Sequence, residues 1–437
     1  MSPSDLVALV CCDLGAIVRG RAVMRSDLEE QLEAGVGWVP ANLAITPLGT
    51  VAEPNPFGST GDLRLLPDRE THVRVPPQDG RSALELLLCD IVETDGRPWE
   101  CCPRQFLRGV LGKLEEELGW KVAASFEHEF QLELDSPPPA PFSLDAQRLA
   151  EPFGTRVMEA LAEAGAQPER FFAEYAPHQF EIPVAPAAGL GSADRAVVVR
   201  EVVREVARRC GTRASFAPLL DPEHAGNGVH VHVSVVDREG SWALYDPRRA
   251  GRLSELGERF AAGILLHGRA LSAFTAPSPA SAARLAPHRW SAGALCLGAG
   301  NRETLLRIPP LVSLAGADPA PQLRLEYRGA DATASPYLTL GAILSAGLDG
   351  VRRELPAAPI LDRDPATLHG EEAERFGVGG LPDSLGEALE ALEDDATAKG
   401  WLPPLLHDAY TSVKRAEVEA SADLDPAEIC RRYARIY

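Results

Sequence analysis

The chain has 437 residues, of which 45% are hydrophobic and 24% are charged, an ordinary composition for a globular protein with a substantial core. Its formal net charge of −20 argues against nucleic acid as a partner, because a surface that binds nucleic acid is basic. No apolar run approaches the ~20 residues that a membrane span needs, so we expect no membrane partner either.

The eight cysteines indicate a reducing compartment. They include the adjacent pairs Cys11–Cys12 and Cys101–Cys102, but none shows the Cys-x-x-Cys spacing that builds zinc or redox sites. The apolar run Leu6–Cys12 has neither the cationic lead nor the small-residue cleavage site of a secretory signal. We therefore expect reduced, mostly buried thiols and a cytoplasmic protein.

The first 98 residues are predicted to form a small β-rich domain. Short apolar runs there alternate with turn signals, among them Asp13–Gly15 and Pro54–Pro56. From Pro103 onward the pattern changes, because apolar residues recur with helical spacing over 104–118 and helices then alternate with acid-bearing strands to about residue 350. The chain is thus predicted to hold two domains, residues 1–98 and 99–437.

Two predicted strands of the second domain carry paired polar residues. Segment 124–133 contains Glu127 and Glu129, and segment 228–236 contains His230 and His232. Alternate residues of a strand lie on the same face, roughly 6–7 Å apart, so each pair points one way. A solvated strand face would also explain glutamates at alternate positions, and for the pair alone it is the commoner explanation.

Further acids stand among aromatic and aliphatic residues, where an ionised group is rarely buried without a partner. They are Glu174 and Glu181 in segment 171–182 and Glu326 in segment 321–328. Together with the strand pairs, they make an oxygen-rich set of five glutamates and a histidine. Such a set suits magnesium or manganese better than a metal that prefers thiolates.

Loops and terminal helices complete the predicted elements. The proline-rich segment 137–141 and the segment 185–191 are predicted to be surface loops. Segment 384–399 is weakly amphipathic and acidic, which is typical of a solvated helix, and a further helix is predicted over 410–421.

Several segments, taken in chain order, resemble motifs of the glutamine synthetase superfamily. Phe126–Phe130 resembles the family's Glu-x-Glu-Phe strand, and Glu174–Glu181 resembles its Glu-x-x-Pro-Gly-Gln-x-Glu element. Gly226–Ser234 is similar to the Gly-x-Gly-Met-His-x-His-x-Ser element. The remaining matches are Asn301-Arg302 with Arg307-Ile-Pro309, Arg324-Leu-Glu-Tyr-Arg328 and Ser335-Pro-Tyr-Leu338. Each motif is weak alone, but their common order is specific.

The resemblance implies an α+β fold in which a small N-terminal β-grasp domain precedes a large catalytic domain with a curved antiparallel sheet flanked by helices. Segments 13–21 and 66–71 resemble the family's N-terminal domain, which lends residues to the neighbouring subunit's active site. A ring-shaped homo-oligomer, commonly a dodecamer of two stacked hexamers, is therefore implied.

The resemblance also implies a site with two or more Mg²⁺ or Mn²⁺ ions and ATP as co-substrate. One ion is assigned to Glu129, Glu174 and Glu181, and the second to Glu127, His230 and Glu326. The arginines that would stabilise the phosphates during transfer are Arg302, Arg307 and Arg324. The residues that fall where the family contacts ATP are His232, Ser234, Arg307 and Arg324, although satisfied strand residues without a ligand would explain His232 and Ser234 equally well.

The glutamate substrate is assigned by the same resemblance to Arg284, Arg328 and the backbone of Gly226. Surface ion pairing in an acidic protein is the alternative role for the arginines. Side chains that the family often uses are missing at two places in this region. Ala225 stands where an asparagine often holds glutamate. Segment 280–284 reads Ala-Ser-Ala-Ala-Arg where Asn-Ser-Tyr-Lys-Arg is frequent.

The amine site departs from the pattern of the ammonia-using members. Trp290 stands at the position of a flap glutamate that takes a proton from ammonium. A neutral indole cannot act as a general base, although it can wall a larger amine. The stretch that carries an ammonium-binding aspartate is unrecognisable in 35–42. His178 replaces a family glycine and is a candidate for facing the amine, although a space-filling loop histidine is the commoner reading.

We therefore predict an ATP-dependent ligase that joins the γ-carboxylate of glutamate to an amine larger than ammonia through γ-glutamyl phosphate. One alternative is glutamine synthetase itself, with a rearranged ammonium site. Another is a catalytically inactive structural relative, against which the retention of all six metal ligands argues. Polyamine, ethanolamine, alkylamine and arylamine acceptors all stay open.

Overall fold

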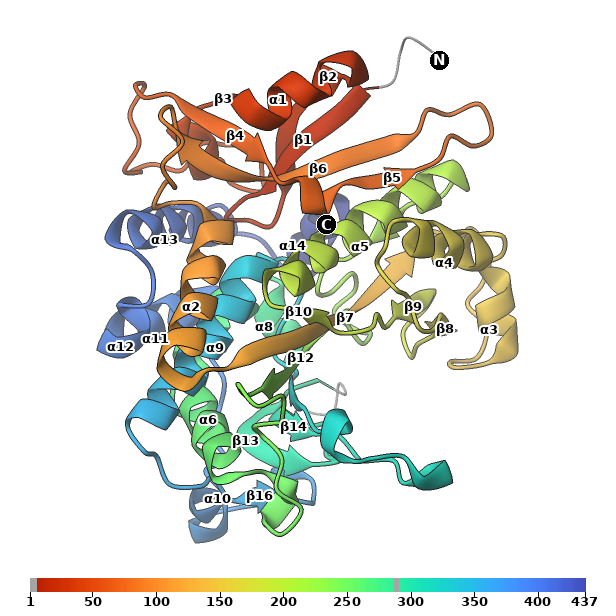
Figure 1. Ribbon diagram of the computed structural model, residues 1–437. Helices are drawn as coiled ribbons and strands as arrows, with labels where there is room; N and C mark the ends of the chain where they lie inside the picture. Colours follow the sequence, from red (N-terminus) through yellow and green to blue (C-terminus); the bar gives the residue numbers. More distant parts are fainter. Residues whose placement is uncertain (1–5, 287–290) are drawn as a thin grey trace.

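The computed structural model describes residues 6–286 and 291–437 and shows a mixed α+β fold with an N-terminal β domain above a larger sheet-and-helix domain (Figure 1). The N-terminal sheet has the strand order β2-β1-β6-β4-β3, with β5 paired to β6. β1 and β6 run parallel, whereas the other neighbours are antiparallel. The elements of this domain are β1 (Leu6–Cys12), β2 (Val18–Met24), α1 (Leu28–Ala34), β3 (Val36–Trp38), β4 (Leu63–Pro67), β5 (Val73–Val75) and β6 (Leu84–Glu93).

The larger sheet has the order β16-β13-β14-β15-β12-β7-β9-β8, and β10 and β11 also pair with β7. It is antiparallel through its central strands, as expected, but β13 runs parallel to β14 and to β16. Its strands are β7 (Lys121–Leu132), β8 (Phe172–Ala173), β9 (Gln179–Ile182), β10 (Ala187–Ala188), β11 (Ala214–Ser215), β12 (Val229–Val236), β13 (Ala294–Ala299), β14 (Thr304–Ile308), β15 (Leu325–Tyr327) and β16 (Ile360–Leu361).

Helices pack against one face of the central strands of this sheet and against one another. The helices are α2 (Pro103–Leu118), α3 (Leu144–Leu149), α4 (Phe153–Glu163), α5 (Leu190–Arg209), α6 (Glu255–Leu266), α7 (Gly268–Thr275), α8 (Ser281–Arg284), α9 (Pro336–Arg352), α10 (Glu371–Arg375), α11 (Leu385–Asp394), α12 (Ala396–Lys399), α13 (Pro404–Glu419) and α14 (Pro426–Ile436). Helix α9 is buried almost all round and contacts α2, α5, α6 and α7, which makes it the centre of the helical layer.

Several predicted elements differ from the structure at their ends. The helix predicted over 384–399 is two helices, because the chain leaves helical geometry at Asp395, whose side chain accepts from the N–H groups that open α12. The helix predicted over 410–421 begins earlier, at Pro404, where proline suits the first turn of a helix. The predicted loop 185–191 contains β10 and the start of α5.

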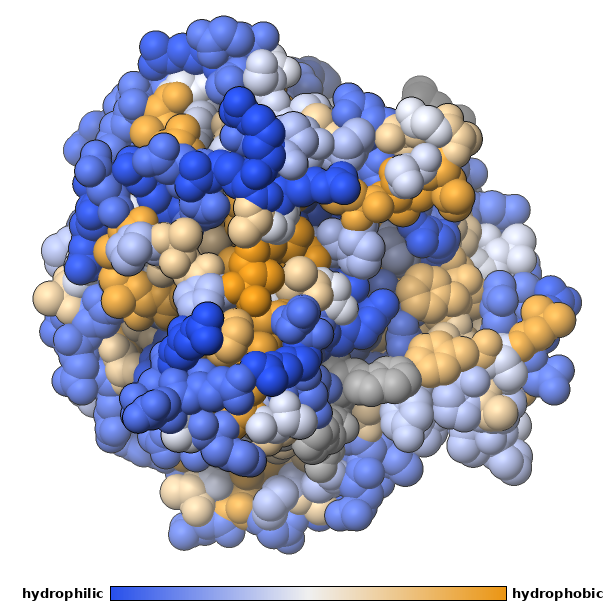
Figure 2. All heavy atoms as spheres, turned by 90° about the horizontal axis from the view of Figure 1, so that it is seen from below, coloured by the Kyte–Doolittle hydropathy of each residue, from blue (hydrophilic) through white to orange (hydrophobic). Residues whose placement is uncertain are grey.

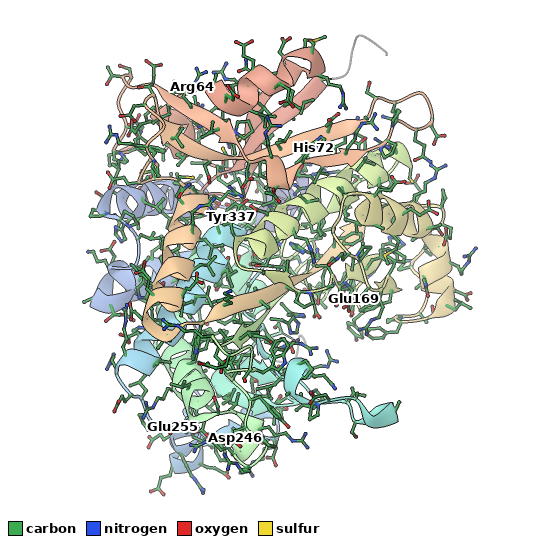
Figure 3. All side chains as sticks on the ribbon, in the orientation of Figure 1. Arg64, His72, Glu169, Asp246, Glu255 and Tyr337 are labelled. Carbon is green, nitrogen blue, oxygen red and sulfur yellow. The ribbon has the colours of Figure 1, made fainter. Side chains whose placement is uncertain are left out.

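A buried ion cluster joins the N-terminal domain to the larger domain. The Arg104 guanidinium, 3% exposed, donates to Asp68 at 2.7 Å and Asp90 at 3.1 Å in the N-terminal domain. It also donates twice to Asp194 on α5, both at 2.9 Å, and Asp194 accepts from the Tyr337 hydroxyl. Tyr337 lies just below the N-terminal domain in Figure 3. One arginine thus ties both domains together.

The surface seen from below is mainly hydrophilic, with smaller hydrophobic patches in recesses between hydrophilic lobes (Figure 2). The segment between β14 and β15 extends away from the body as an arm, teal in Figure 1. None of the described helices combines the length and the apolar character that crossing a bilayer requires.

Candidate active site

The strand register of the larger sheet gathers the predicted acids and imidazoles. β7 lies between β12 and β9, and β15 lies on the other side of β12. Residues directly opposite one another on antiparallel strands have neighbouring side chains. The pairs that face each other in this way are Glu127 with His230, Glu129 with Glu181, and His232 with Glu326.

The two faces of β7 have opposite character. Phe126, His128 and Phe130 are buried against the core, with 2%, 2% and 0% of their surface exposed. Glu127 and Glu129 alternate with them and line a cavity of about 580 Å³. A solvated strand face does not describe this arrangement, because the acids converge with residues of other strands inside the cavity.

Two groups of three potential ligands lie in this cavity. Within each group the ligand atoms are all within 4.8 Å of one another, and the groups are Glu127, His232 and Glu326, and Glu129, Glu181 and His230. Relative to the assignment implied by the resemblance, His232 takes the place of His230 in the first group, and His230 takes the place of Glu174 in the second. His230 lies between the groups, with Nδ1 3.6 Å from Glu127 Oε2 and Nε2 3.9 Å from Glu129 Oε1.

The surroundings of His232 favour His230 as the metal ligand. Arg324 Nε donates to His232 Nδ1 at 3.0 Å, so that nitrogen carries the lone pair of a neutral imidazole. The proton of the ring then sits on Nε2, which lies 3.0 Å from Glu127 Oε1. His232 therefore has no nitrogen left for an ion while it holds Arg324.

The electrostatics at β9 fit a site built for cations. Burial, together with the charge of Glu129, raises the pKa of Glu174 to about 7. Burial and the carboxylates of Glu127, Glu129 and Glu174 raise the pKa of Glu181 well above its usual range. Crowded carboxylates of this kind ionise together only when a cation balances them. Oxygen and imidazole donors without thiolates suit Mg²⁺ or Mn²⁺, so these residues fit the implied ions.

Glu326 lies in a different environment, among positive groups. Its burial would raise its pKa, but neighbouring groups, above all the Arg328 guanidinium, lower it to about 2. Arg307 Nη1 donates to Glu326 Oε2 at 2.7 Å, and Arg328 donates to the other oxygen. The carboxylate is therefore ionised and fixed in place at the centre of the arginine cluster.

Gly226 and Arg284 form the part of the cavity assigned to glutamate. A Cβ on Gly226 would lie 2.0 Å from the Pro218 carbonyl oxygen and 2.8 Å from Arg284 Cγ, so only glycine fits. Arg284 is 2% exposed and donates from Nη2 to the Ala330 carbonyl at 2.8 Å. Gln179, which was not among the sequence candidates, donates to Gly226 O at 2.9 Å and lines the same cavity.

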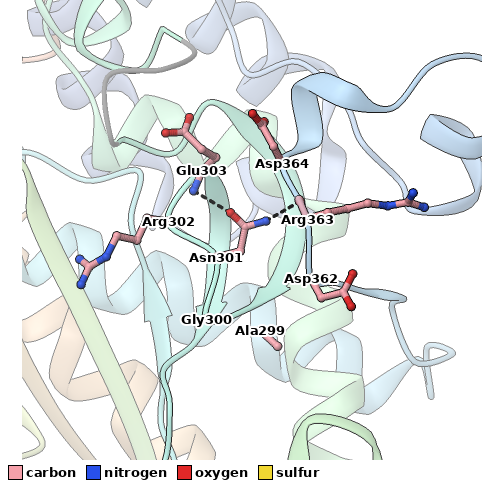
Figure 4. A pocket seen from close by; sticks show the side chains of 8 residues that line it. All are labelled: Ala299, Gly300, Asn301, Arg302, Glu303, Asp362, Arg363 and Asp364. Carbon is pink, nitrogen blue, oxygen red and sulfur yellow. Dashed lines mark hydrogen bonds between the residues drawn. The ribbon is translucent and has the colours of Figure 1, made fainter.

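Arg302 stands at the rim, where it lines the main cavity and a second, shallower cavity of about 470 Å³. Figure 4 shows its side chain pointing away from Asp362, Arg363 and Asp364 on the far side of that second cavity. Asn301 holds the wall between them, because its Nδ2 donates to the Arg363 carbonyl at 2.8 Å. Arg302 is thus exposed and directed away from the segment 362–364.

Two sequence candidates do not line the described cavity wall. Ser234 Oγ donates to the Leu323 carbonyl at 2.8 Å, and Ser234 is absent from the described lining. His178 also does not line it. Its φ of 52° lies in the left-handed region, which explains why glycine suits this turn. Trp290 lies outside the described residues.

The cavity also has an outer wall that sequence reasoning missed. Its residues, termed the outer wall below, are Phe142, Arg170, Phe172, Tyr175 and Pro183. They come from loops and the short strand β8, and no periodic pattern in the sequence marks them. The signals in the sequence were the phenylalanine directly after the proline-rich loop and the aromatic residues of segment 171–182.

Family models for glutamine synthetase match the chain in two parts, the N-terminal domain over residues 1–99 and the catalytic domain over residues 100–432. The chain belongs to the glutamine synthetase family. Members of this family are ligases that use glutamate, ATP, divalent metal ions and ammonia or an amine.

Individual relatives cover nearly the whole of this glutamine synthetase-family chain. Gamma-glutamylpolyamine synthetase GlnA3 of Streptomyces coelicolor is 32% identical over 98% of this chain and 92% of that protein. Glutamine synthetase of Mycolicibacterium smegmatis is 31% identical over 94% and 92%.

Solved structures of related proteins match the fold of this chain over nearly its whole length. A crystal structure of a novel glutamine synthase homolog matches with a TM-score of 0.93 and 46% identity, covering 100% of this chain and 99% of that one. The GmaS/ADP complex matches with a TM-score of 0.82 and 26% identity, covering 98% and 96%.

Proposed function

We propose that this glutamine synthetase-family ligase joins the γ-carboxylate of glutamate to an amine larger than ammonia, through γ-glutamyl phosphate. The observation that carries the proposal is the convergence, in one cavity of about 580 Å³, of carboxylates, His230 and a cluster of arginines on a fixed strand register. This combination suits phosphoryl transfer onto a carboxylate, which requires charge neutralisation at both reactants.

The reaction has two steps. A γ-carboxylate oxygen of glutamate attacks the γ-phosphorus of ATP, and ADP leaves. The amine nitrogen then attacks the carbonyl carbon, the bond from carbon to the bridging oxygen breaks, phosphate leaves and the nitrogen loses a proton. Divalent ions held by the carboxylates would neutralise the phosphate oxygens during the first step.

Arginines supply the remaining positive charge in this proposal. Arg302 and Arg307 would contact the transferred phosphate, and Arg324 would contact ATP, since all three line the cavity. Arg324 also holds His232 in one tautomer through the 3.0 Å hydrogen bond to Nδ1, so His232 would act by positioning Arg324.

Glutamate would be held at the other end of the cavity. Arg284 and Arg328 are both almost fully buried, at 2% and 1% exposed, and both line the cavity beside the Gly226 backbone. Buried guanidinium groups bind carboxylates strongly and with fixed geometry. This arrangement selects an amino acid with a free carboxylate near the phosphorylated one.

Three observations support an acceptor other than ammonia. The flap position holds Trp290, and the aspartate-bearing stretch of ammonia-using members is unrecognisable in 35–42. GlnA3, which is 32% identical, is a gamma-glutamylpolyamine synthetase by name. Glutamine synthetase is the second candidate, because a glutamine synthetase is 31% identical over nearly the same length.

We also propose a ring-shaped homo-oligomer, commonly a dodecamer in this family, on the basis of the family's N-terminal domain at residues 1–99. The mass in solution by light scattering tests this, and a monomer at working concentration would contradict it. All eight cysteines are free thiols, which supports a cytoplasmic location.

The function is tested by glutamate-dependent ADP release with a panel of amines and ammonium. We expect kcat/KM for at least one primary amine to exceed that for ammonium by about 10²-fold, a ratio that apolar pocket contacts can supply. Efficient use of ammonium would establish glutamine synthetase instead. Absence of ADP release with every acceptor tested, in the presence of Mg²⁺ or Mn²⁺, would identify an inactive relative.

A further inference from the structure

The outer wall offers two aromatic rings to whatever lies beyond the reacting nitrogen. Phe142 precedes α3 and Tyr175 lies in the turn between β8 and β9, yet their ring centroids are 6.4 Å apart. Both line the cavity and keep 52% and 53% of their surface exposed. Tyr175 directly follows Glu174, so this aromatic pair is continuous with the carboxylate end of the cavity. The two rings therefore offer an apolar surface within the same cavity as the carboxylates.

The charges of the described cavity wall favour one class of acceptor over another. Among the described residues, the carboxylates that line the cavity are those assigned to the metal ions, namely Glu127, Glu129, Glu174, Glu181 and Glu326. All other charged groups of the described lining, apart from the histidines, are arginines. Neither set leaves an acid for a second ammonium group of the acceptor.

Arg170 places a positive charge within the outer wall itself. Its side chain is 71% exposed and its Nη2 lies 3.4 Å from Glu169, which does not line the cavity. An exposed pair of this kind is weak, so the guanidinium still repels a nearby cation. Aromatic faces can attract cations, but the positive charge of Arg170 in the same wall opposes that attraction.

We propose, building on the ligase function above, that the acceptor is a primary amine with an apolar or aromatic tail and no second ammonium group. The tail lies against Phe142 and Tyr175, which remove it from water, while the amino group reaches the phosphorylated glutamate. This class differs from the polyamine named for GlnA3.

A matched pair of acceptors tests the tail directly. Hexylamine and 1,6-diaminohexane have the same carbon chain and differ only in the second ammonium group. We expect kcat/KM for glutamate-dependent ADP release to be at least about tenfold higher with hexylamine. An equal or higher value with 1,6-diaminohexane would overturn the proposed tail class while the ligase function stands. Ammonium as the best acceptor would instead overturn the proposed use of an amine larger than ammonia and establish glutamine synthetase.

Variants of the outer wall locate the effect. Phe142→Ala and Tyr175→Ala should each raise KM for hexylamine about tenfold and leave KM for ATP and glutamate unchanged. Leu144→Ala is the matched control, because Leu144 is 70% exposed next to Phe142 but does not line the cavity. Unchanged KM in both aromatic variants, or the same increase in the control, would overturn the assignment of this wall.

Arg170 tests the charge argument separately. Arg170→Glu replaces the positive group by the acid that the described wall lacks. The preference for hexylamine over 1,6-diaminohexane should then fall about tenfold, because the second ammonium gains an attractive partner. A preference that stays as in the wild type would show that Arg170 does not set it.

Discussion

The carboxylate end of the cavity and its outer wall are built in different ways. The carboxylates stand on paired strands, where register fixes which residues face one another. The outer wall comes from the loop before α3, the short strand β8 and the turn that follows it. Strand positions serve chemistry that a whole family shares, whereas loops can change without disturbing the sheet. We infer that the first region carries out phosphoryl transfer and the second selects the acceptor.

The largest expected effect concerns the carboxylates. Glu129→Gln and Glu326→Gln keep the shape of each side chain but remove one ligand charge, and each should lower glutamate-dependent ATP turnover by about 10³-fold. Glu133→Gln is the matched control, because Glu133 follows β7 directly and its side chain is 62% exposed. Near-normal turnover in either folded variant would contradict the two-ion assignment.

A backbone change near the substrate should act more weakly. Gly226→Ala introduces a Cβ that would lie 2.0 Å from the Pro218 carbonyl oxygen, so the loop must move. Displacement of a substrate contact by about 1 Å can cost about 10²-fold, and we expect this loss mainly in KM for glutamate. Gly191→Ala on α5 has open space for its Cβ and should leave kinetics unchanged. A change in KM for ATP alone would contradict the assignment of Gly226 to glutamate.

Metal affinity should depend on pH because of the crowded carboxylates. Burial and the charge of Glu129 raise the pKa of Glu174 to about 7, so the metal-free protein holds a proton there below that pH. Ion binding requires the carboxylate, and Mn²⁺ affinity should rise by up to about tenfold per pH unit as pH approaches 7, then level off. Calorimetry in buffers of different ionisation enthalpy measures the proton released. Affinity that is independent of pH would contradict this coupling.

The same raised pKa has a consequence for stability. Between the ordinary value of 4.5 and about 7, the folded metal-free protein binds more protons at Glu174 than the unfolded chain does. Its free energy of unfolding should therefore fall as pH rises through that window, and bound metal should remove the decline. Denaturation with and without Mn²⁺ across this range checks the sign.

The smallest expected effect on catalysis concerns charges that hold the domains together. Arg104→Met leaves Asp68, Asp90 and Asp194 without their shared partner, and we expect a loss of about 3 kcal/mol in the free energy of unfolding. Arg108→Met, one turn along α2 and 48% exposed, should cost less than about 1 kcal/mol. Equal losses in denaturant titrations would contradict the role of Arg104. Turnover by the folded fraction should not change.

The contrast between strands and loops also explains what the sequence could predict. Alternation within 124–133 and 228–236 indicated which side chains share a face, because the period of a strand depends only on local geometry. The family resemblance then supplied the order of the motifs and the α+β fold.

Features set by tertiary contacts could not be predicted in this way. Nothing local in the sequence indicates that Phe142 meets Tyr175, since loops bring them together. The hydrogen bond from Arg324 to His232 Nδ1, which disfavours His232 as a metal ligand, also depends on the pairing of β12 with β15. The early start of α13 at Pro404 shows that the apolar period alone does not locate a helix end.

In the proposed reaction glutamate is phosphorylated before the amine attacks, and oxygen transfer from glutamate to phosphate is the sharpest test of this order. Glutamate labelled with ¹⁸O in its γ-carboxylate, ATP and hexylamine are incubated with the enzyme, and the phosphate released is analysed by mass spectrometry. We expect one ¹⁸O atom in each phosphate formed with γ-glutamyl hexylamide. Unlabelled phosphate accompanying amide formation would contradict it.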